Sequence, residues 1–257
     1  MDDICIQIVN YKTKKYLLPC LDALFADLEG SKLKYSVAIL DNASGDDLSD
    51  IPKRYPEQRV EINQNDKNVG FGAGHNILAK HAQAKYLLLL NPDIKIIEPH
   101  TIERLLERAK QSKAQVVGPR LINAAGKSQL YDHGELYGLR AWVANNAGHA
   151  FWRERKDRAE VAWVSGAVFL IEKSWFDRLG GFDENFFLYA EELDLCLRLR
   201  NGGGHVIYDP TITMLHYGSV VAKKSMHQRA SNDYFVDKHF HSRWDYPLLK
   251  LINKIVN

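Results

Sequence analysis

The residues best suited to chemistry are concentrated in the segment 182–195, where four aromatic side chains and five carboxylates share fourteen positions. On a helix that begins near Ala190, Glu191 and Asp194 share one side, where acidic groups of a first turn complement the helix macrodipole. Glu192 aligns instead with the apolar stripe of that helix, which the macrodipole does not explain. A partly desolvated glutamate has a raised pKa and is suited to act as a general base.

Polar residues also follow three of the expected strands, at the point where each strand ends. Asn10 and Tyr11 follow the first strand, residues 41–44 follow the second, and residues 91–93 follow a buried strand further along. Ligands bind at the carboxyl ends of strands in parallel α/β sheets. Asparagine, aspartate and serine also form ordinary turns, so one such turn indicates nothing by itself. Their recurrence after three strands favours a ligand-binding rim.

The segment 68–76 is rich in glycine and opens a helix. Backbone N–H groups in such a segment can approach a phosphate, and a helix N-terminus favours anions. A flexible turn has the same composition, so this signal is open to both interpretations. The spacing matches neither a dinucleotide-binding fingerprint nor a P-loop.

Two further residues are candidates for a metal site. A bound diphosphate needs positive charge, and a divalent metal is the usual source of it. Asp93 is the one carboxylate of its turn, and His216 follows a late strand and offers a nitrogen ligand. Taken alone, a single histidine is more often a packed or hydrogen-bonded residue than a ligand.

These residues must be positioned by an alternation of strands and helices. Apolar runs predict strands, and apolar residues at helical spacing predict helices. The expected strands are 4–9, 37–40, 60–62, 86–90, 163–171, 206–208 and 211–215, and the expected helices are 14–28, 76–84, 190–200 and one that runs from after residue 174 to 180. Such an alternation indicates an α/β fold with a mostly parallel central sheet covered on both faces.

The chain has no linker that would divide it into two large domains. We expect one domain over residues 1–220 and a helical appendage over residues 221–257. Residues 120–160 show no clear period. Within them, the charged segment 153–158 predicts a solvated, mobile loop.

Composition narrows the function classes. The 257 residues carry 34 Lys and Arg against 32 Asp and Glu, and this balance lacks the basic excess of a nucleic-acid-binding domain. Three widely spaced cysteines exclude a disulfide framework and a CxxC zinc site. No apolar run approaches the ~18–20 residues of a transmembrane helix, and the acidic N-terminus is unlike a signal peptide. We therefore expect a cytoplasmic protein, soluble or peripheral on the inner face of the membrane.

Taken together and in order, the motifs resemble those of the family 2 glycosyltransferases with the GT-A fold. The subgroup of bacterial rhamnosyltransferases and related enzymes of surface-polysaccharide assembly is the most similar. The matching segments are 9–11, 41–46, 68–76, 89–93, 165–167, 180–195 and His216. Each motif is modest by itself, but the ordered set is specific.

The resemblance implies a role for each matching residue. The residues that it implies in donor binding are Asn10, Tyr11, Asp41, Asn68, Gly70, Gly72 and Asn91. Asp93 and His216 resemble the protein ligands of a divalent metal, Mg²⁺ or Mn²⁺, and Glu192 takes the position of the catalytic base. The residues implied around the acceptor or behind the catalytic groups are Glu191, Asp194, Trp163 and Gly166. Two positions depart from the family pattern, because Asn91 replaces the first Asp of the D-x-D motif and Glu192 stands where Asp is usual.

The implied reaction is inverting transfer of a sugar, a deoxyhexose such as rhamnose, from a dTDP- or UDP-linked donor. The acceptor is a hydroxyl of a glycan or a lipid-linked glycan in bacterial surface-polysaccharide synthesis. Two alternatives compete with this reading. A sugar nucleotidyltransferase needs a glycine-rich loop after the first strand, which is absent after Asn10. A catalytically silent nucleotide-sugar or glycan-binding subunit would not need Asp93, Glu192 and His216.

The C-terminal segment 223–257 carries seven Lys or Arg against three Asp, a net charge of +4. Asp245 and Pro247 suit the start of a helix. Its polar stripe is expected to hold Lys250, Asn253, Lys254 and Asn257, and its apolar face Leu248, Leu249, Leu251, Ile252, Ile255 and Val256. Such a face lies on an anionic membrane, or it packs on the catalytic domain or a second subunit, and the sequence favours neither.

Overall fold

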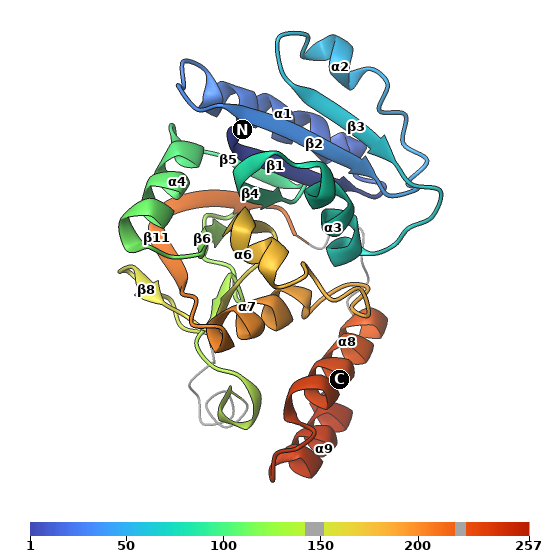
Figure 1. Ribbon diagram of the computed structural model, residues 1–257, viewed down its shortest axis with the longest axis vertical. Coiled ribbons are helices and arrows are strands. Elements are labelled where there is room, and N and C mark those ends of the chain that lie inside the picture. Colours follow the sequence, from blue (N-terminus) through green and yellow to red (C-terminus); the bar gives the residue numbers. More distant parts are fainter. Residues whose placement is uncertain (142–151, 219–224, 257) are drawn as a thin grey trace.

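The computed structural model describes residues 1–141, 152–218 and 225–256 (Figure 1). The helices are α1 (Lys14–Leu28), α2 (Ile51–Arg54), α3 (Phe71–His81), α4 (Thr101–Ser112), α6 (Lys173–Arg178), α7 (Glu191–Asn201), α8 (Ser225–Phe240) and α9 (Tyr246–Val256). The strands are β1 (Asp2–Asn10), β2 (Tyr35–Asp41), β3 (Val60–Gln64), β4 (Ala84–Leu90), β5 (Ile94–Ile96), β6 (Val116–Ile122), β7 (His133–Gly134), β8 (Ala159–Glu160), β9 (Trp163–Val164), β10 (Val168–Glu172) and β11 (Val206–His216). The α/β fold expected from the sequence is confirmed.

One mixed sheet organises the described part of the chain. Its strands follow the order β3-β2-β1-β4-β10-β6-β11-β5, and β8 pairs with β11. Strands β1 to β4 are parallel where they pair, and β11 runs parallel to β6. Strands β10, β5 and β8 are antiparallel to their neighbours. The expected parallel arrangement therefore holds for the first four strands, and the second half of the chain adds antiparallel partners.

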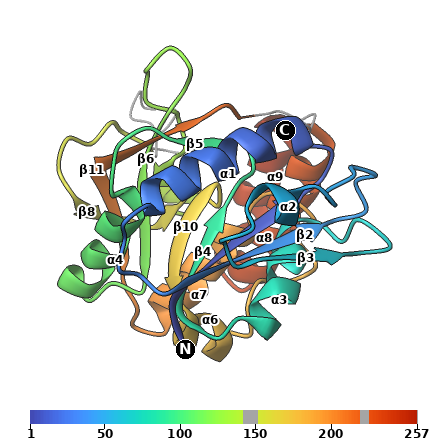
Figure 2. The ribbon, with the colours of Figure 1, turned by 90° about the horizontal axis from the view of Figure 1, so that it is seen from above.

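Both faces of the sheet are covered, because the side chains of β1 alternate between two buried clusters. Ile4, Ile6 and Ile8 pack with residues of α1 and α4. Cys5 faces the other way and joins the cluster that contains residues of α3, α6 and α7. Successive side chains of a strand point to opposite faces, so a strand with no polar face needs helices on both sides. Figure 2 shows α1 lying across the strands.

Helix α3 begins at Phe71, earlier than the expected start at 76, so the glycine-rich segment itself forms the first turn. Gly70 precedes the helix with φ of 93°, a left-handed conformation that favours glycine. A Cβ on Gly72 would lie 2.9 Å from Phe182, and one on Gly74 would lie 3.0 Å from Val9. Glycine lowers helix propensity, but here close packing on both sides of the helix outweighs that cost.

Two predictions of strands were wrong about where a strand is interrupted. The expected strand 163–171 is divided by a turn at residues 165–167, and its first part, β9, pairs with β7 in a separate two-stranded sheet. The expected strands 206–208 and 211–215 form the single strand β11. Its register against β6 shifts between Asp209 and Thr213, around Pro210, which has no backbone N–H to donate.

The sequence pattern missed six elements, α2, α4, β5, β6, β7 and β8. Strands β6, β7 and β8 lie partly or wholly in the stretch 120–160, which has no clear period, and residues 142–151 of that stretch lie outside the described residues. The segment 153–158 lies mostly at the surface as expected, although Arg155 is only partly exposed and pairs with Glu135.

The C-terminal appendage is a hairpin of α8 and α9 that extends from the side of the molecule carrying α7 (Figure 1). It shares one buried cluster with the body. That cluster contains Phe186, Ala190, Phe235, Val236, Phe240 and Leu249. The expected boundary at residue 220 falls in 219–224, outside the described residues. No helix of the described chain has the length and apolar character needed to span a bilayer.

Candidate active site

The ends of β1 and β2 bring the first two candidate segments together. Asn10 and Asp41 are register partners in the parallel pair. The Asn10 side-chain amide donates to Asp41 Oδ1 at 3.4 Å and to Ser44 Oγ at 3.1 Å, and Thr13 Oγ1 donates to Asn10 Oδ1 at 2.7 Å. Asn10 is fully buried and therefore holds this turn in shape, while the adjacent Tyr11 is partly exposed. The ends of β1 and β2, two of the three strand ends expected to form a rim, are thus joined in one hydrogen-bonded unit.

Asn42 connects this rim to the glycine-rich segment. Its amide nitrogen donates to Asn68 Oδ1 at 2.8 Å and to the Gly70 carbonyl at 3.1 Å. Its amide oxygen accepts from the Val69 N–H at 3.1 Å. Asn68, expected in donor binding, therefore lies beside the end of β2, although 26 residues separate it from Asn42.

The glycine-rich segment also contacts the segment that leads into α7. A Cβ on Gly70 would lie 2.3 Å from the Phe187 carbonyl oxygen, which no real side chain tolerates. The Phe71 N–H donates to that same oxygen at 2.9 Å. A Cβ on Gly72 would meet Phe182 at 2.9 Å. Gly70 and Gly72 thus have a packing role here, in addition to any contact with a donor.

Asn76 holds the same two segments together and was missed as a functional residue. Its amide nitrogen donates to the Phe182 carbonyl at 2.9 Å and to Glu184 Oε1 at 3.0 Å, and its amide oxygen accepts from the Phe182 N–H at 2.9 Å. A Cβ on Gly181 would lie 2.4 Å from that amide oxygen. Asn76 therefore fixes the course of the chain toward the candidate base.

Helix α7 starts after an unusual backbone segment. Tyr189 and Ala190 both have left-handed φ values, 74° and 66°. Residues other than glycine in this region cost about 1–3 kcal/mol each, and they persist where the surrounding structure enforces them. The turn places Glu191 and Glu192 in the first turn of α7, next to the glycine-rich segment.

Both glutamates of this turn are buried at their carboxyl groups. Oε2 of Glu191 and Oε2 of Glu192 are inaccessible and have no hydrogen-bond partner among the described residues. Burial raises the pKa of Glu192 to about 7, and N–H groups of Glu192, Gly166 and Leu193 offset part of that effect. Burial, and then the charge of Glu192, raise the pKa of Glu191 well above its ordinary value. The sequence pattern set Glu192 apart, but the structure buries Glu191 at least as deeply.

Gly166 and Trp163 lie behind the candidate base. A Cβ on Gly166 would lie 3.2 Å from Phe71 and 3.8 Å from Glu192 Cβ, so this turn borders the base directly. Trp163 is buried and packs over Gly134, where a Cβ would meet its ring at 2.2 Å. Trp163 therefore fits a supporting position and not one in contact with an acceptor.

Asp194 connects α7 to the C-terminal hairpin. It pairs with Arg198 as expected, at 2.7 Å, and also with His239 at 2.7 Å and Lys238 at 2.6 Å. Burial alone would raise the pKa of Asp194, but the hydrogen bonds from His239 and Lys238 outweigh it and leave the pKa lowered. Asp194 therefore joins the start of α7 to α8 through ion pairs with Lys238 and His239.

Asp93 and His216 meet at the far end of the rim because β5 and β11 are antiparallel neighbours. Asp93 Oδ1 lies 3.5 Å from His216 Nε2, and Asp93 Oδ2 accepts from the Gly218 N–H at 2.9 Å. Asn91 directly follows β4, and its N–H donates to the Ala167 carbonyl at 2.9 Å. Asn91 therefore borders the turn that carries Gly166.

Gln129 fixes the His216 ring and was missed by the sequence pattern. Its amide nitrogen donates to the His216 carbonyl at 2.6 Å, and its amide oxygen lies 2.8 Å from His216 Nδ1. The amide orientation set by the carbonyl leaves an oxygen facing Nδ1, so Nδ1 carries the proton. The lone pair of Nε2 then faces Asp93, which is the tautomer that a metal ligand needs.

This pair fits a divalent cation, although it does not complete a metal site. Neighbouring ligands of an octahedral cation such as Mg²⁺ lie about 3 Å apart, close to the 3.5 Å between Oδ1 and Nε2. Across the described residues, no three His, Cys, Asp or Glu side chains gather into a group that could hold a metal ion. The remaining ligands would have to come from a bound molecule.

Comparison with known proteins decides the family. Residues 4–180 match the family model described as Glycosyl transferase family 2. The chain belongs to glycosyl transferase family 2. Among curated relatives, this glycosyltransferase is 26% identical to the N-acetylglucosaminyl-diphospho-decaprenol L-rhamnosyltransferase of Mycobacterium tuberculosis, over 90% of this chain and 84% of that protein. It is 28% identical to Rhamnosyltransferase WbbL of Escherichia coli, over 83% of both chains.

Solved structures of other glycosyltransferases have the same fold. The mannosyltransferase PcManGT from Pyrobaculum calidifontis, in complex with GDP-Man and Mn²⁺, superposes with a TM-score of 0.63 at 14% identity, over 100% of this chain and 67% of that one. TarS of S. aureus (residues 1–349) superposes with a TM-score of 0.61, also at 14% identity, over 94% of this chain and 72% of that one.

A buried polar network supports the Gly166 turn of the glycosyltransferase from behind. Asp132 accepts hydrogen bonds from Trp152 Nε1 at 2.6 Å and Tyr208 Oη at 2.9 Å, and contacts His133 Nδ1 at 2.7 Å. Its backbone carbonyl accepts from the Ser165 N–H at 2.9 Å. These residues lie in the aperiodic stretch or far from it in sequence, so no sequence pattern signalled the network.

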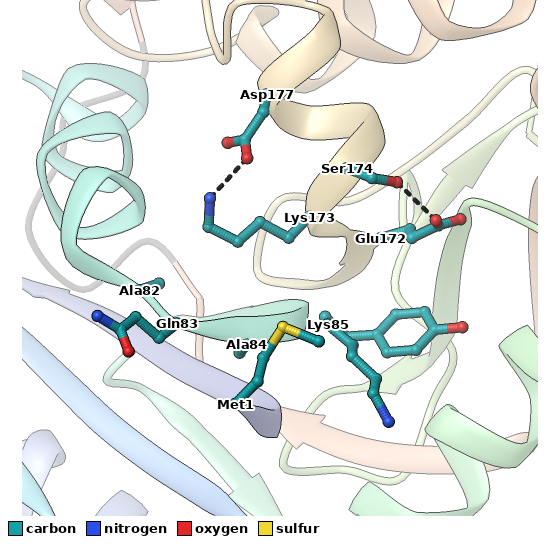
Figure 3. Close-up of a pocket in the computed structure, with 10 residues that line it drawn as sticks. Met1, Ala82, Gln83, Ala84, Lys85, Glu172, Lys173, Ser174 and Asp177 are labelled. Carbon is teal, nitrogen blue, oxygen red and sulfur yellow. Dashed lines mark hydrogen bonds and ion pairs between the residues drawn. The ribbon is translucent and has the colours of Figure 1, made fainter.

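A surface pocket lies at the opposite end of the sheet (Figure 3). Its lining includes Met1, residues Ala84 and Lys85 at the start of β4, and residues Lys173 and Asp177 of α6. Lys173 and Asp177 form an ion pair at 2.6 Å. The catalytic candidates lie at the other end of the same strand, after Leu90. The pocket is therefore separate from the candidate active site.

Proposed function

We propose that this glycosyltransferase moves a deoxyhexose, rhamnose, from a dTDP- or UDP-linked donor to a hydroxyl of a glycan or lipid-linked glycan, with inversion at the anomeric carbon. The relatives named as rhamnosyltransferases support the sugar class. The observation that carries the proposal is the buried Glu192 carboxyl, whose Oε2 has no partner in the described structure. It is an unused proton acceptor beside a rim suited to a nucleotide.

The donor would bind along that rim. The Asn10–Asp41 unit would take the nucleobase end, with Tyr11 beside it. Asn68, which precedes α3 and is held beside the end of β2 by Asn42, would lie nearest the diphosphate. Asn91 directly follows β4 and would face the sugar.

A divalent cation, Mg²⁺ or Mn²⁺, would be held by Asp93 and His216 together with oxygens of the donor. When bound, it would neutralise the negative charge of the departing diphosphate. Among the described residues, Asp93 and His216 are not joined by a third ligating side chain, so oxygens of the donor would have to complete the coordination of the cation. The structural neighbour crystallised with GDP-Man and Mn²⁺ supports the choice of ion.

Glu192 would act as the general base. Its Oε2 takes the proton of the acceptor hydroxyl while that oxygen forms a bond to the anomeric carbon. The bond from the anomeric carbon to the diphosphate oxygen breaks on the opposite face, and its electron pair leaves with the diphosphate. A diphosphate is a good leaving group, so no second carboxylic acid is needed to protonate it. One displacement of this kind inverts the anomeric centre.

A donor screen tests the proposal. The protein is incubated with Mn²⁺ and a panel of nucleotide sugars, and both the melting temperature and the hydrolysis of the donor are measured. We expect dTDP-rhamnose or a UDP-linked deoxyhexose to raise the melting temperature by mass action, and to be hydrolysed slowly without acceptor. Stabilisation without hydrolysis or transfer would identify a binding subunit. Absence of any nucleotide-sugar effect would contradict the proposal.

Replacing Gln129 with alanine is expected to weaken Mn²⁺ binding about 10–100-fold, because the substitution frees the His216 ring to rotate and to change tautomer. The measurement is the Mn²⁺ electron paramagnetic resonance signal, titrated in the presence of nucleoside diphosphate. Gln111→Ala, on the exposed surface of α4, is the matched control and should bind Mn²⁺ like the wild type. Unchanged Mn²⁺ affinity in Gln129→Ala would show that the ring needs no support.

A further inference from the structure

The apolar residues predicted for one face of α9 differ in their exposure to solvent: some are buried and others are exposed. Leu249 and Ile252 are buried, at 4% and 8% exposure, and Leu249 belongs to the cluster shared with α8. Leu248 and Leu251 are exposed, at 42% and 54%. The side chains of Asn253, Ile255 and Val256, and residue Asn257, lie outside the described residues. Packing on the protein therefore accounts for only part of this face.

The exposed part continues beyond the helix. Trp244, just before α9, is 84% exposed. Leu248 and Leu251 are three residues apart and lie on one side of α9, and Trp244 comes two residues before the helix begins. We name these three residues the α9 stripe. An exposed tryptophan next to two exposed leucines is unusual for a surface that meets only water.

Residues 225–257 carry five Lys and Arg against three Asp. All three aspartates are paired within the hairpin. Lys250 contacts Asp237 at 3.0 Å and Asp233 at 3.7 Å, and Arg243 contacts Asp245 at 2.8 Å. Residues 225–257 hold no other acidic side chain. Lys254 is exposed near the end of α9 and has no ion pair with any described residue. An anionic surface would therefore meet cations and no free carboxylate.

We propose that the α9 stripe docks the protein on an anionic lipid bilayer. Tryptophan favours the boundary between lipid headgroups and acyl chains, and leucines with lysines alongside suit the same depth. Basic residues near the surface add attraction to anionic headgroups. The inference rests on the proposed function in one respect, since an acceptor carried by a lipid would be delivered at this surface.

A second copy of the chain is less suited than a bilayer to cover the α9 stripe. Stable dimers bury about 800 Å² on each partner. One tryptophan and two half-exposed leucines offer about 300 Å².

Vesicle flotation with the full chain tests the inference. Vesicles of phosphatidylcholine alone are compared with vesicles containing about a third phosphatidylglycerol. We expect the wild type to float with the anionic vesicles, and 0.5 M salt to weaken the binding. The variant Trp244→Ser/Leu248→Ser/Leu251→Ser should lose about tenfold or more in partitioning, and Lys254→Glu should lose less. Ile97→Ser, which replaces another exposed apolar residue at 43% exposure, should float like the wild type.

Two further measurements make the result unambiguous. Circular dichroism melting shows that the triple variant folds, and transfer or hydrolysis with soluble substrates shows whether the active site is intact. Equal flotation of the triple variant and wild type would overturn the inference. So would a wild type that ignores vesicles and forms a dimer that the triple variant loses. Flotation needs no donor, so it can succeed or fail independently of the proposed sugar transfer.

Discussion

The Glu192→Gln variant is expected to transfer sugar at least ~100-fold more slowly than the wild type, with donor binding nearly unchanged. Glutamine keeps the size and polarity of the side chain but cannot accept a proton. The buried Oε2 of Glu192 has no partner that could take over this task among the described residues. Transfer is measured with saturating donor and acceptor, and donor affinity is measured separately by calorimetry.

The pH dependence provides a second readout of the same base. The pKa of Glu192 is about 7, and only the ionised carboxylate can accept the proton. We therefore expect kcat/KM to fall about tenfold per pH unit below pH 7 and to level off above it. Glu191→Gln is the matched control. Burial, and then the charge of Glu192, raise the pKa of Glu191 well above the ordinary value, and glutamine keeps the size of the side chain, so we expect the amide to replace it at little cost. If Glu191→Gln lost transfer activity and Glu192→Gln kept it, Glu191 and not Glu192 would be the general base.

Removing the divalent cation is expected to abolish transfer, and Asp93→Ala should have the same effect. Asp93 and His216, 3.5 Å apart, are the protein groups that we propose to hold the cation, and Asp93→Ala removes the charged one. Activity should vanish in EDTA and return with Mn²⁺ or Mg²⁺ in the wild type, but not in Asp93→Ala.

The control for this experiment is Asp177→Ala, which removes an exposed carboxylate at the other end of the sheet. It should respond to EDTA and metal like the wild type. Full activity in the chelator, or a normal thermal response of Asp93→Ala to nucleoside diphosphate plus Mn²⁺, would refute the assignment of the metal site.

The part of the site that rests on strand ends could be predicted from the sequence. Asn10 and Asp41 follow apolar runs, and parallel pairing makes them register partners. The same logic placed Asp93 after β4. Glu192 could be singled out because helical spacing puts it in line with apolar residues. These inferences use local patterns, which the structure preserves.

The contacts that join distant segments could not be predicted. Gln129 contacts His216 across 87 residues, from a stretch without any period. Asn76 contacts Phe182 across 106 residues. Glu191 also packs against α3, since a Cβ on Gly72 would lie 3.5 Å from its Cβ. Helical spacing describes one helix and contains no information on which neighbour covers it.

The close contact between Gly70 and Phe187 has a consequence for engineering donor specificity. The backbones of the segment 68–76, which we propose to border the donor, and of the segment 181–190 touch directly, and Asn76 hydrogen-bonds across the same junction. A chimera that takes one of these segments from a relative would bring mismatched surfaces together at a junction with no room for an added methyl group. The two segments therefore form one exchangeable cassette, and recombination that aims to change the sugar nucleotide has to move both from the same parent.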